Sequence, residues 1–140
     1  MERFRIIKEK STDKKIFFEA NGKDLKEVFK NAGFALLSVI CDRESLEAEQ
    51  AEEFEMDGSD AADTMFIWLS GIVAVANAES MCFSKVEIEE MDEKHIKAKL
   101  WGEPKTAEKA GRRVEAILQE GYSFENDQEG YSVKAALILS

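Results

Sequence analysis

The sequence has few of the residues from which common catalytic and metal centres are built. Its 140 residues include one histidine and one proline, and its two cysteines, Cys41 and Cys82, are too far apart for a CxxC pair. Serine or cysteine triads and multi-histidine metal sites are therefore disfavoured, and no glycine-rich phosphate-binding motif is present. We interpret the two cysteines as reduced thiols in the core rather than as a disulfide or a metal pair.

Positive charge is also scarce. Nineteen basic residues stand against twenty-nine acidic ones, which gives a formal net charge of −10. Affinity for nucleic acid comes largely from lysine and arginine that neutralise phosphates, so we expect no direct nucleic-acid binding. A basic protein partner fits this charge better.

Long hydrophobic runs are missing as well. The longest uncharged stretch, residues 64–78, is shorter than the roughly 20 apolar residues needed to cross a bilayer. We expect it to form a buried helix of a soluble protein. The N-terminal residues contain no apolar segment of signal-peptide length, so the predicted location is cytoplasmic, without membrane association.

The remaining pattern predicts one α+β domain over residues 1–140, because no flexible linker or internal repeat divides the chain. Apolar side chains at helical spacing predict helices over 24–41 and 61–78. Alternating apolar side chains predict a hairpin around Ser11–Lys14 and further strands near 52–56, 84–90, 95–101, 112–124 and 131–139. The expected fold consists of mainly antiparallel β-sheet layers packed with two α-helices.

Carboxylates at strand ends are the candidate functional groups. If Asp13, Glu103 and Glu120 converge with the C-terminal carboxylate of Ser140, their oxygens would suit a hard cation such as Ca²⁺. The alternative for Glu120 is a solvated strand end, and the alternative for Glu103 is a role in its loop. A hydrolase that uses Asp13 and Glu120 as paired carboxylates is a further alternative, which needs the two side chains within a few ångströms.

Three other residues receive structural interpretations. His95 shares its phase with Lys97 and Lys99, so we expect it on the solvent face of a strand. We expect Trp68 and Trp101 in the core rather than at a base-stacking surface, because no basic patch accompanies them.

Several short motifs, in order along nearly the whole chain, resemble the archease family. They are KSTDKKI (10–16), ANGKDLKEVFKNAGFALLSVICD (20–42), IWLSGI (67–72), FSKVEI (83–88), WGEP (101–104) and the closing VKAALILS. The resemblance implies a non-enzymatic protein cofactor of the RtcB-type, GTP-dependent RNA ligase of tRNA splicing and RNA repair, which promotes ligase guanylylation and turnover. We assign a partner-binding role to Glu103 and Glu120.

The family's metal site implies that Asp13 and the terminal Ser140 act as ligands together with an acid near the C-terminal end. Leu139, the next-to-last residue, stands where the family has this acid. Lys10 and Lys15 replace a histidine and a glycine of the family's turn. Glu120 is the candidate compensating ligand. We expect Ca²⁺ binding to be weak or lost. The alternative function is a divergent binding or chaperone-like module with this fold for a different protein partner.

Overall fold

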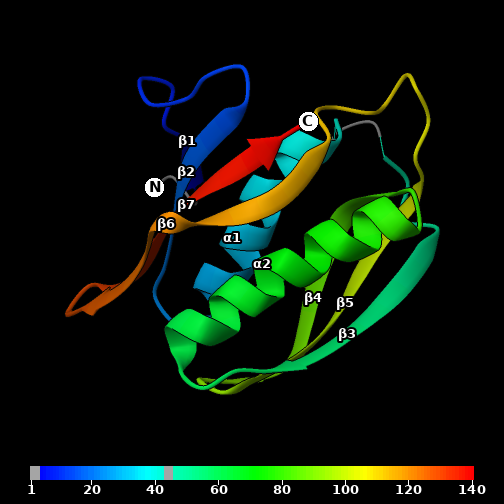
Figure 1. Ribbon diagram of the computed structural model, residues 1–140. Coiled ribbons are helices and arrows are strands. Elements are labelled where there is room, and N and C mark those ends of the chain that lie inside the picture. Colours follow the sequence, from blue (N-terminus) through cyan, green and yellow to red (C-terminus); the bar gives the residue numbers. More distant parts are fainter. Residues whose placement is uncertain (1–3, 43–45) are drawn as a thin grey trace.

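The computed structural model describes residues 4–42 and 46–140 and shows two antiparallel sheets packed with two helices (Figure 1). The elements are β1 (Phe4–Ile6), β2 (Lys15–Gly22), α1 (Leu25–Ile40), β3 (Gln50–Asp57), α2 (Ala61–Ala78), β4 (Met81–Asp92), β5 (His95–Pro104), β6 (Val114–Asp127) and β7 (Gly130–Leu139). One sheet has the order β1-β2-β7-β6 and the other β3-β5-β4. Each helix contacts strands of both sheets. The predicted α+β fold with two helices is confirmed, and the strand predicted near 52–56 extends over 50–57.

Helix α1 begins at a reciprocal cap. The Asp24 side chain accepts a hydrogen bond from the Glu27 N–H at 2.9 Å, and the Glu27 carboxylate accepts one from the Lys23 N–H at 3.2 Å. Such a pair satisfies backbone donors that the first turn of a helix leaves free. The helix then places Val28, Phe29 and Leu36 fully inside the core.

Helix α2 is capped by Asp60, whose side chain accepts from the Asp63 N–H at 2.8 Å. Its length and apolar composition alone would allow it to cross a membrane. In the structure it packs on the core, where Trp68 is fully buried and its indole N–H donates to the Phe29 carbonyl at 3.0 Å. Only 39% of the helix is buried, so one of its sides stays at the molecular surface.

Cys41 and Cys82 form a disulfide, with their Cα atoms 5.8 Å apart. The interpretation of these residues as reduced thiols is therefore wrong. Cys41 follows the last residue of α1, and Cys82 is the second residue of β4. The two meet because the helix packs on β4, and spacing in the sequence does not reveal such packing. The bond links α1 covalently to the three-stranded sheet.

The outer face of the three-stranded sheet carries charged side chains. His95 lies there as predicted, with Lys97 and Lys99 in the same phase of β5. Trp101 shares this phase, so it is only partly buried, and the Lys85 ammonium lies 5.8 Å from its ring centre. The expectation that Trp101 belongs to the core is therefore wrong.

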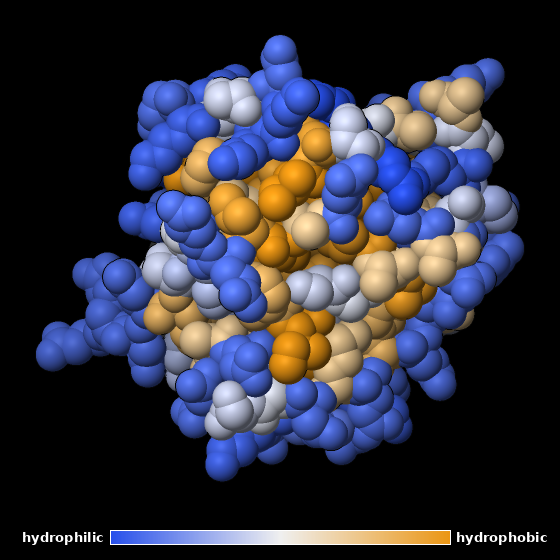
Figure 2. All heavy atoms as spheres, in the orientation of Figure 1, coloured by the Kyte–Doolittle hydropathy of each residue, from blue (hydrophilic) through white to orange (hydrophobic). Residues whose placement is uncertain are grey.

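The outer face of the four-stranded sheet is more apolar. Phe17 and Leu118 are each paired with Ala136 in neighbouring strands, so all three side chains point to one face. Phe17 and Leu118 remain partly exposed. Figure 2 shows a group of hydrophobic side chains near the middle of the visible face, surrounded by hydrophilic ones.

Candidate functional site

The turn that carries Asp13 lies between β1 and β2 and is organised by its neighbour Thr12. The Thr12 N–H donates to the Lys15 carbonyl at 2.8 Å. The Thr12 hydroxyl accepts from the N–H groups of Lys14 and Lys15, both at 3.2 Å. The Asp13 side chain is exposed and makes none of these contacts, so it does not help to hold the turn in its conformation.

The end of the chain lies beside this turn. The Leu139 N–H donates to the Lys14 carbonyl at 2.8 Å, and the Ser140 N–H donates to the Arg113 carbonyl at 3.2 Å. Antiparallel pairing of β2 with β7 produces this arrangement, because Lys15 is opposite Ile138. The structure thus brings Asp13 and Ser140 to one end of the four-stranded sheet.

The groups gathered at this end do not fit a hard divalent cation. The Arg112 guanidinium donates a hydrogen bond to the Asp13 carbonyl, so a fixed positive charge already lies beside the turn. Leu139 is 4% exposed and belongs to the core. Within residues 4–42 and 46–140, no three His, Cys, Asp or Glu side chains are grouped as metal ligands. Ca²⁺ prefers several carboxylate oxygens among its six to eight ligands, and the Asp13 and C-terminal carboxylates would have to bind it beside the Arg112 guanidinium, which repels a cation.

Glu120 lies apart from the Asp13 turn. It is exposed on β6, at a bulge between the pairs Leu118–Ala136 and Ser123–Lys134. Its position along the sheet is therefore about five residues from Ser140, or ~17 Å at the rise of a strand. The strand register does not bring Glu120 to Asp13, either as a compensating ligand or as a catalytic partner.

Glu103 occupies a different place, near the disulfide. It lies opposite Cys82 in the pairing of β5 with β4 and is 7% exposed. One carboxylate oxygen accepts from the Lys109 ammonium at 2.6 Å, and the other accepts from the Glu47 N–H at 2.7 Å. These two bonds, the one from Lys109 first, lower the pKa of the Glu103 carboxyl, and the same carboxylate raises the pKa of Lys109. Glu103 thus holds together the segment that contains Glu47 and the loop that contains Lys109.

The connector, residues 105–113, joins these two places. Its Lys109 carbonyl accepts from the Asp42 N–H at 2.9 Å, and its Gly111 and Arg112 N–H groups donate to the last carbonyls of α1, on Ile40 and Val39, at 2.7 and 2.8 Å. A Cβ atom at Gly111 would collide with the Val39 carbonyl oxygen. The connector therefore needs glycine at this point to close the end of α1.

Sequence reasoning missed the roles of Lys109 and Arg112. Both lie in the connector, whereas the sequence predicted a strand from residue 112 and β6 begins only at Val114. Sequence alone assigns no partner to a lysine or an arginine in a loop. In the Gly-Arg-Arg run at 111–113, the glycine is a residue that permits a close backbone approach, but it does not identify the partner of either arginine.

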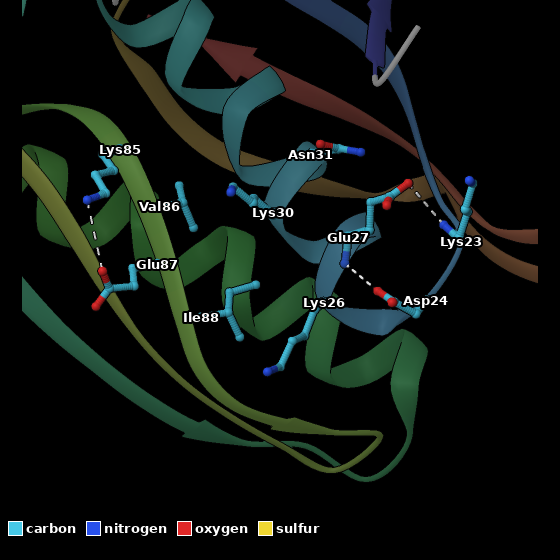
Figure 3. Close-up of a pocket in the computed structure, with 10 residues that line it drawn as sticks. All are labelled: Lys23, Asp24, Lys26, Glu27, Lys30, Asn31, Lys85, Val86, Glu87 and Ile88. Atoms are coloured by element: carbon cyan, nitrogen blue, oxygen red, sulfur yellow. Dashed lines mark hydrogen bonds and ion pairs between the residues drawn. The ribbon is translucent and has the colours of Figure 1, made fainter. Parts of the chain in front are cut away.

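Sequence reasoning also missed a groove of about 750 Å³ between α1 and β4 (Figure 3). One wall is the N-terminal half of α1, and the other is formed by β4 residues 85–88. The groove lies away from the Asp13 turn. Its helical residues belong to the start of α1, whereas Arg112 bonds both the Asp13 carbonyl and the end of α1.

Comparison with known proteins agrees with this fold. The sequence profile of the Archease protein family (MTH1598/TM1083) matches residues 8–137. The protein archease of Methanothermobacter thermautotrophicus is 32% identical over 125 residues, which cover 87% of this chain and 89% of that protein. The protein archease of Sulfurisphaera tokodaii is 31% identical over 120 residues, or 83% and 86% of the two chains.

Two solved structures have a similar fold. The solution structure of Methanobacterium thermoautotrophicum protein 1598 superposes with a TM-score of 0.75 at 26% identity and covers 100% of this chain and 99% of its own. A Thermotoga maritima crystal structure, described as an archease and possible chaperone, gives a TM-score of 0.62 at 15% identity over 89% and 88% of the two chains. Because the family profile and the relatives match over most of its length, the chain belongs to the archease family.

Proposed function

We propose that this protein is a non-enzymatic cofactor that activates an RtcB-type, GTP-dependent RNA ligase in tRNA splicing and RNA repair. It would promote guanylylation of the ligase and its multiple turnover. The observation that carries the proposal is membership of the archease family over nearly the whole chain. The net charge of −10 supports it, because an RNA ligase must present a basic surface to its substrate.

The proposed activity does not depend on Ca²⁺ at the Asp13 turn. Arg112 binds the turn, and Leu139 supplies no ligand there. Contact with the ligase would instead rest on the shape and charge of the protein surface, with Glu120 as an exposed contact. Glu103 would contribute indirectly, since both of its oxygens are already engaged.

The cytoplasmic location stays a prediction. An RNA ligase of tRNA splicing would be met inside the cell, whereas disulfides form and persist mainly in oxidising compartments. Quantifying free thiols at Cys41 and Cys82 directly after lysis under alkylating conditions would decide whether this bond forms in the compartment where the protein works.

A second candidate function is a chaperone-like module for a different protein partner. The poor fit of the Asp13 turn to a cation favours it, as does the description of the Thermotoga maritima structure as a possible chaperone. It would share the fold and the acidic surface but would act on a protein other than the ligase.

The direct test adds the purified protein to its host's RNA ligase with GTP and measures the ligase–GMP adduct and product per ligase over time. We expect faster adduct formation and more than one turnover, with no effect of EGTA. Asp13→Ala should retain the stimulation. Absence of any stimulation would refute the cofactor role, and affinity purification from host cells would then identify the partner of the chaperone-like alternative.

A further inference from the structure

The groove between α1 and β4 is lined by more lysines than carboxylates, although the protein as a whole is acidic. Four lysines line it, which are Lys23, Lys26, Lys30 and Lys85. All four side chains are exposed. Within the described part of the chain, no carboxylate forms an ion pair with Lys23, Lys26 or Lys30. The Lys30 ammonium lies 5.8 Å from the centre of the Phe34 ring, which leaves its positive charge uncompensated. Lys23, Lys26 and Lys30 can therefore attract an anionic ligand.

The carboxylates of the groove are already in use. Asp24 and Glu27 accept backbone hydrogen bonds at the start of α1. Glu87 lies 4.0 Å from Lys85. These contacts offset part of the negative charge of the three carboxylates, so the lysines of α1 are available to attract an anionic ligand. Figure 3 shows Lys26 and Lys30 on the side of α1 that faces Val86 and Ile88 of β4.

The second wall of the groove is a strand edge. In the sheet order β3-β5-β4, strand β4 is paired on one side with β5, and the described residues include no strand on its other side. An edge of this kind presents backbone N–H and C=O groups that can pair with an added strand. Val86, 2% exposed, and the partly exposed Ile88 add an apolar floor.

From this combination we propose that the groove binds an extended, acidic peptide segment of a protein partner, which adds to the free edge of β4 as a further strand. Side chains alternate along a strand, so every second residue of the peptide would face α1. Carboxylates at those positions would meet Lys26 and Lys30, and the peptide backbone would pair with β4 residues 85–88.

A peptide fits the groove better than a nucleic acid. Single-stranded nucleic acid is usually held by aromatic side chains on which bases stack, together with basic residues. The residues that line this groove are lysines, carboxylates, Asn31, Val86 and Ile88, without an aromatic ring. The inference does not rest on the proposed ligase function, because it concerns the chemistry of the groove alone.

The test uses a fluorescein-labelled, end-capped peptide of seven residues with alternating glutamate and valine. We expect saturable binding by fluorescence anisotropy that weakens with added salt. In NMR spectra of the full-length protein, amide signals over 85–88 and over the first turns of α1 should shift. Alternate amides of this part of β4 should also exchange more slowly with solvent.

Two comparisons separate strand addition from general charge attraction. The same peptide with N-methyl groups on alternate backbone amides keeps its charge but cannot pair as a strand, so it should bind at least about fivefold more weakly. The double variant Lys26→Glu with Lys30→Glu should weaken binding of the unmodified peptide by at least about fivefold. Its matched control, Lys8→Glu with Lys10→Glu, changes the net charge equally at exposed positions outside the groove and should change binding less than about twofold.

Three outcomes would overturn the proposal. Equal binding of the N-methylated peptide would exclude strand addition. Equal loss in both double variants would show attraction by net charge only. Tighter binding of a single-stranded RNA oligomer of the same charge, with shifts at the same residues, would assign the groove to nucleic acid.

Discussion

The Asp13 turn and the disulfide region both bring distant parts of the chain together, but they differ in how the carboxylate of each is bonded. We define the disulfide region as Cys41, Cys82, Glu103 and Lys109. There a carboxylate is nearly buried and both of its oxygens are bonded. At the turn the carboxylate of Asp13 is exposed, and its backbone carbonyl is the group that Arg112 binds. The Glu103 side chain therefore has a structural role in the disulfide region, whereas the Asp13 side chain remains available to a binding partner at the turn.

The comparison shows that a carboxylate at a strand end is no indication of a site by itself. In the sequence, Asp13 was a candidate metal ligand and Glu103 a candidate partner contact at a strand end, yet the structure gives the two carboxylates different surroundings. The number and direction of the donors around each carboxylate decide this, and the connector supplies donors to both places through Lys109 and Arg112.

The largest expected effect is on the disulfide. Replacing both cysteines, as Cys41→Ala with Cys82→Ala, should lower the free energy of unfolding by ~4 kcal/mol, because the bond closes a loop between residues 41 positions apart. Urea unfolding of the variant, and of wild type with and without reductant, measures the loss. Identical unfolding of the oxidised and reduced wild type would show that the bond adds nothing to stability.

The next effect concerns Glu103. Glu103→Gln should lower the melting temperature, because the Lys109 ammonium loses its charged partner. The pKa of Glu103 is lowered in the fold, so its contribution is full above the unfolded pKa of about 4.3 and is lost as the pH falls through the folded value. The pKa of Lys109 is raised, so its contribution is full below about 10.4 and is lost as the pH rises through the folded value.

Melting curves across pH would therefore separate Glu103 from an ordinary surface acid. We expect Glu103→Gln to flatten the loss of stability at low pH and at high pH. Glu53→Gln is the matched control, because Glu53 is exposed and lies 3.9 Å from Lys99. An equal shift in both variants would mean that Glu103 behaves as a surface carboxylate.

A smaller effect is expected for Ca²⁺ at the Asp13 turn. Calorimetric titration of wild type should show no tight binding. Arg112→Asp should bind Ca²⁺ more tightly than wild type, because it replaces a positive charge beside the turn with carboxylate oxygens. Arg113→Asp, with the same change in net charge, serves as the control. Tight binding by wild type that disappears in Asp13→Ala would instead establish a metal site in the native protein.

The smallest effect is expected at His95, a partly exposed group outside both regions. A hydrogen bond to Asp57 at 2.6 Å, with Glu55 nearby, raises its pKa above 6.5. The contribution of protonated His95 to the stability of the fold is therefore full below the unfolded pKa of about 6.5. It is lost as the pH rises through the raised pKa of the folded state. In an NMR titration, Asp57→Asn should bring the His95 pKa closer to 6.5 with little change in melting temperature. Glu87→Gln should leave it unchanged.

The sequence was sufficient for the helices and for most strands. Apolar residues at helical spacing located α1 and α2 within one residue of their ends. Alternation also placed His95 on the outer face of β5, and the same alternation, followed one position further than Leu100, would have placed Trp101 there.

The features missed by the sequence analysis depend on which segments become neighbours. The disulfide needs α1 to pack on β4, and the groove needs β4 to be an edge strand. The bond between Lys109 and Glu103 depends on the path of the connector. No local pattern of residues specifies these three-dimensional contacts.

The disulfide also gives the chain a covalent topology that its linear order conceals. Strand β3 and helix α2 lie entirely between Cys41 and Cys82. The disulfide therefore closes this part of the chain into a covalent ring, which the chain enters at Cys41 and leaves at Cys82. A protease that cuts once inside this ring would produce two fragments that stay joined. The nicked protein would migrate as one band on a denaturing gel without reductant and as two bands with it.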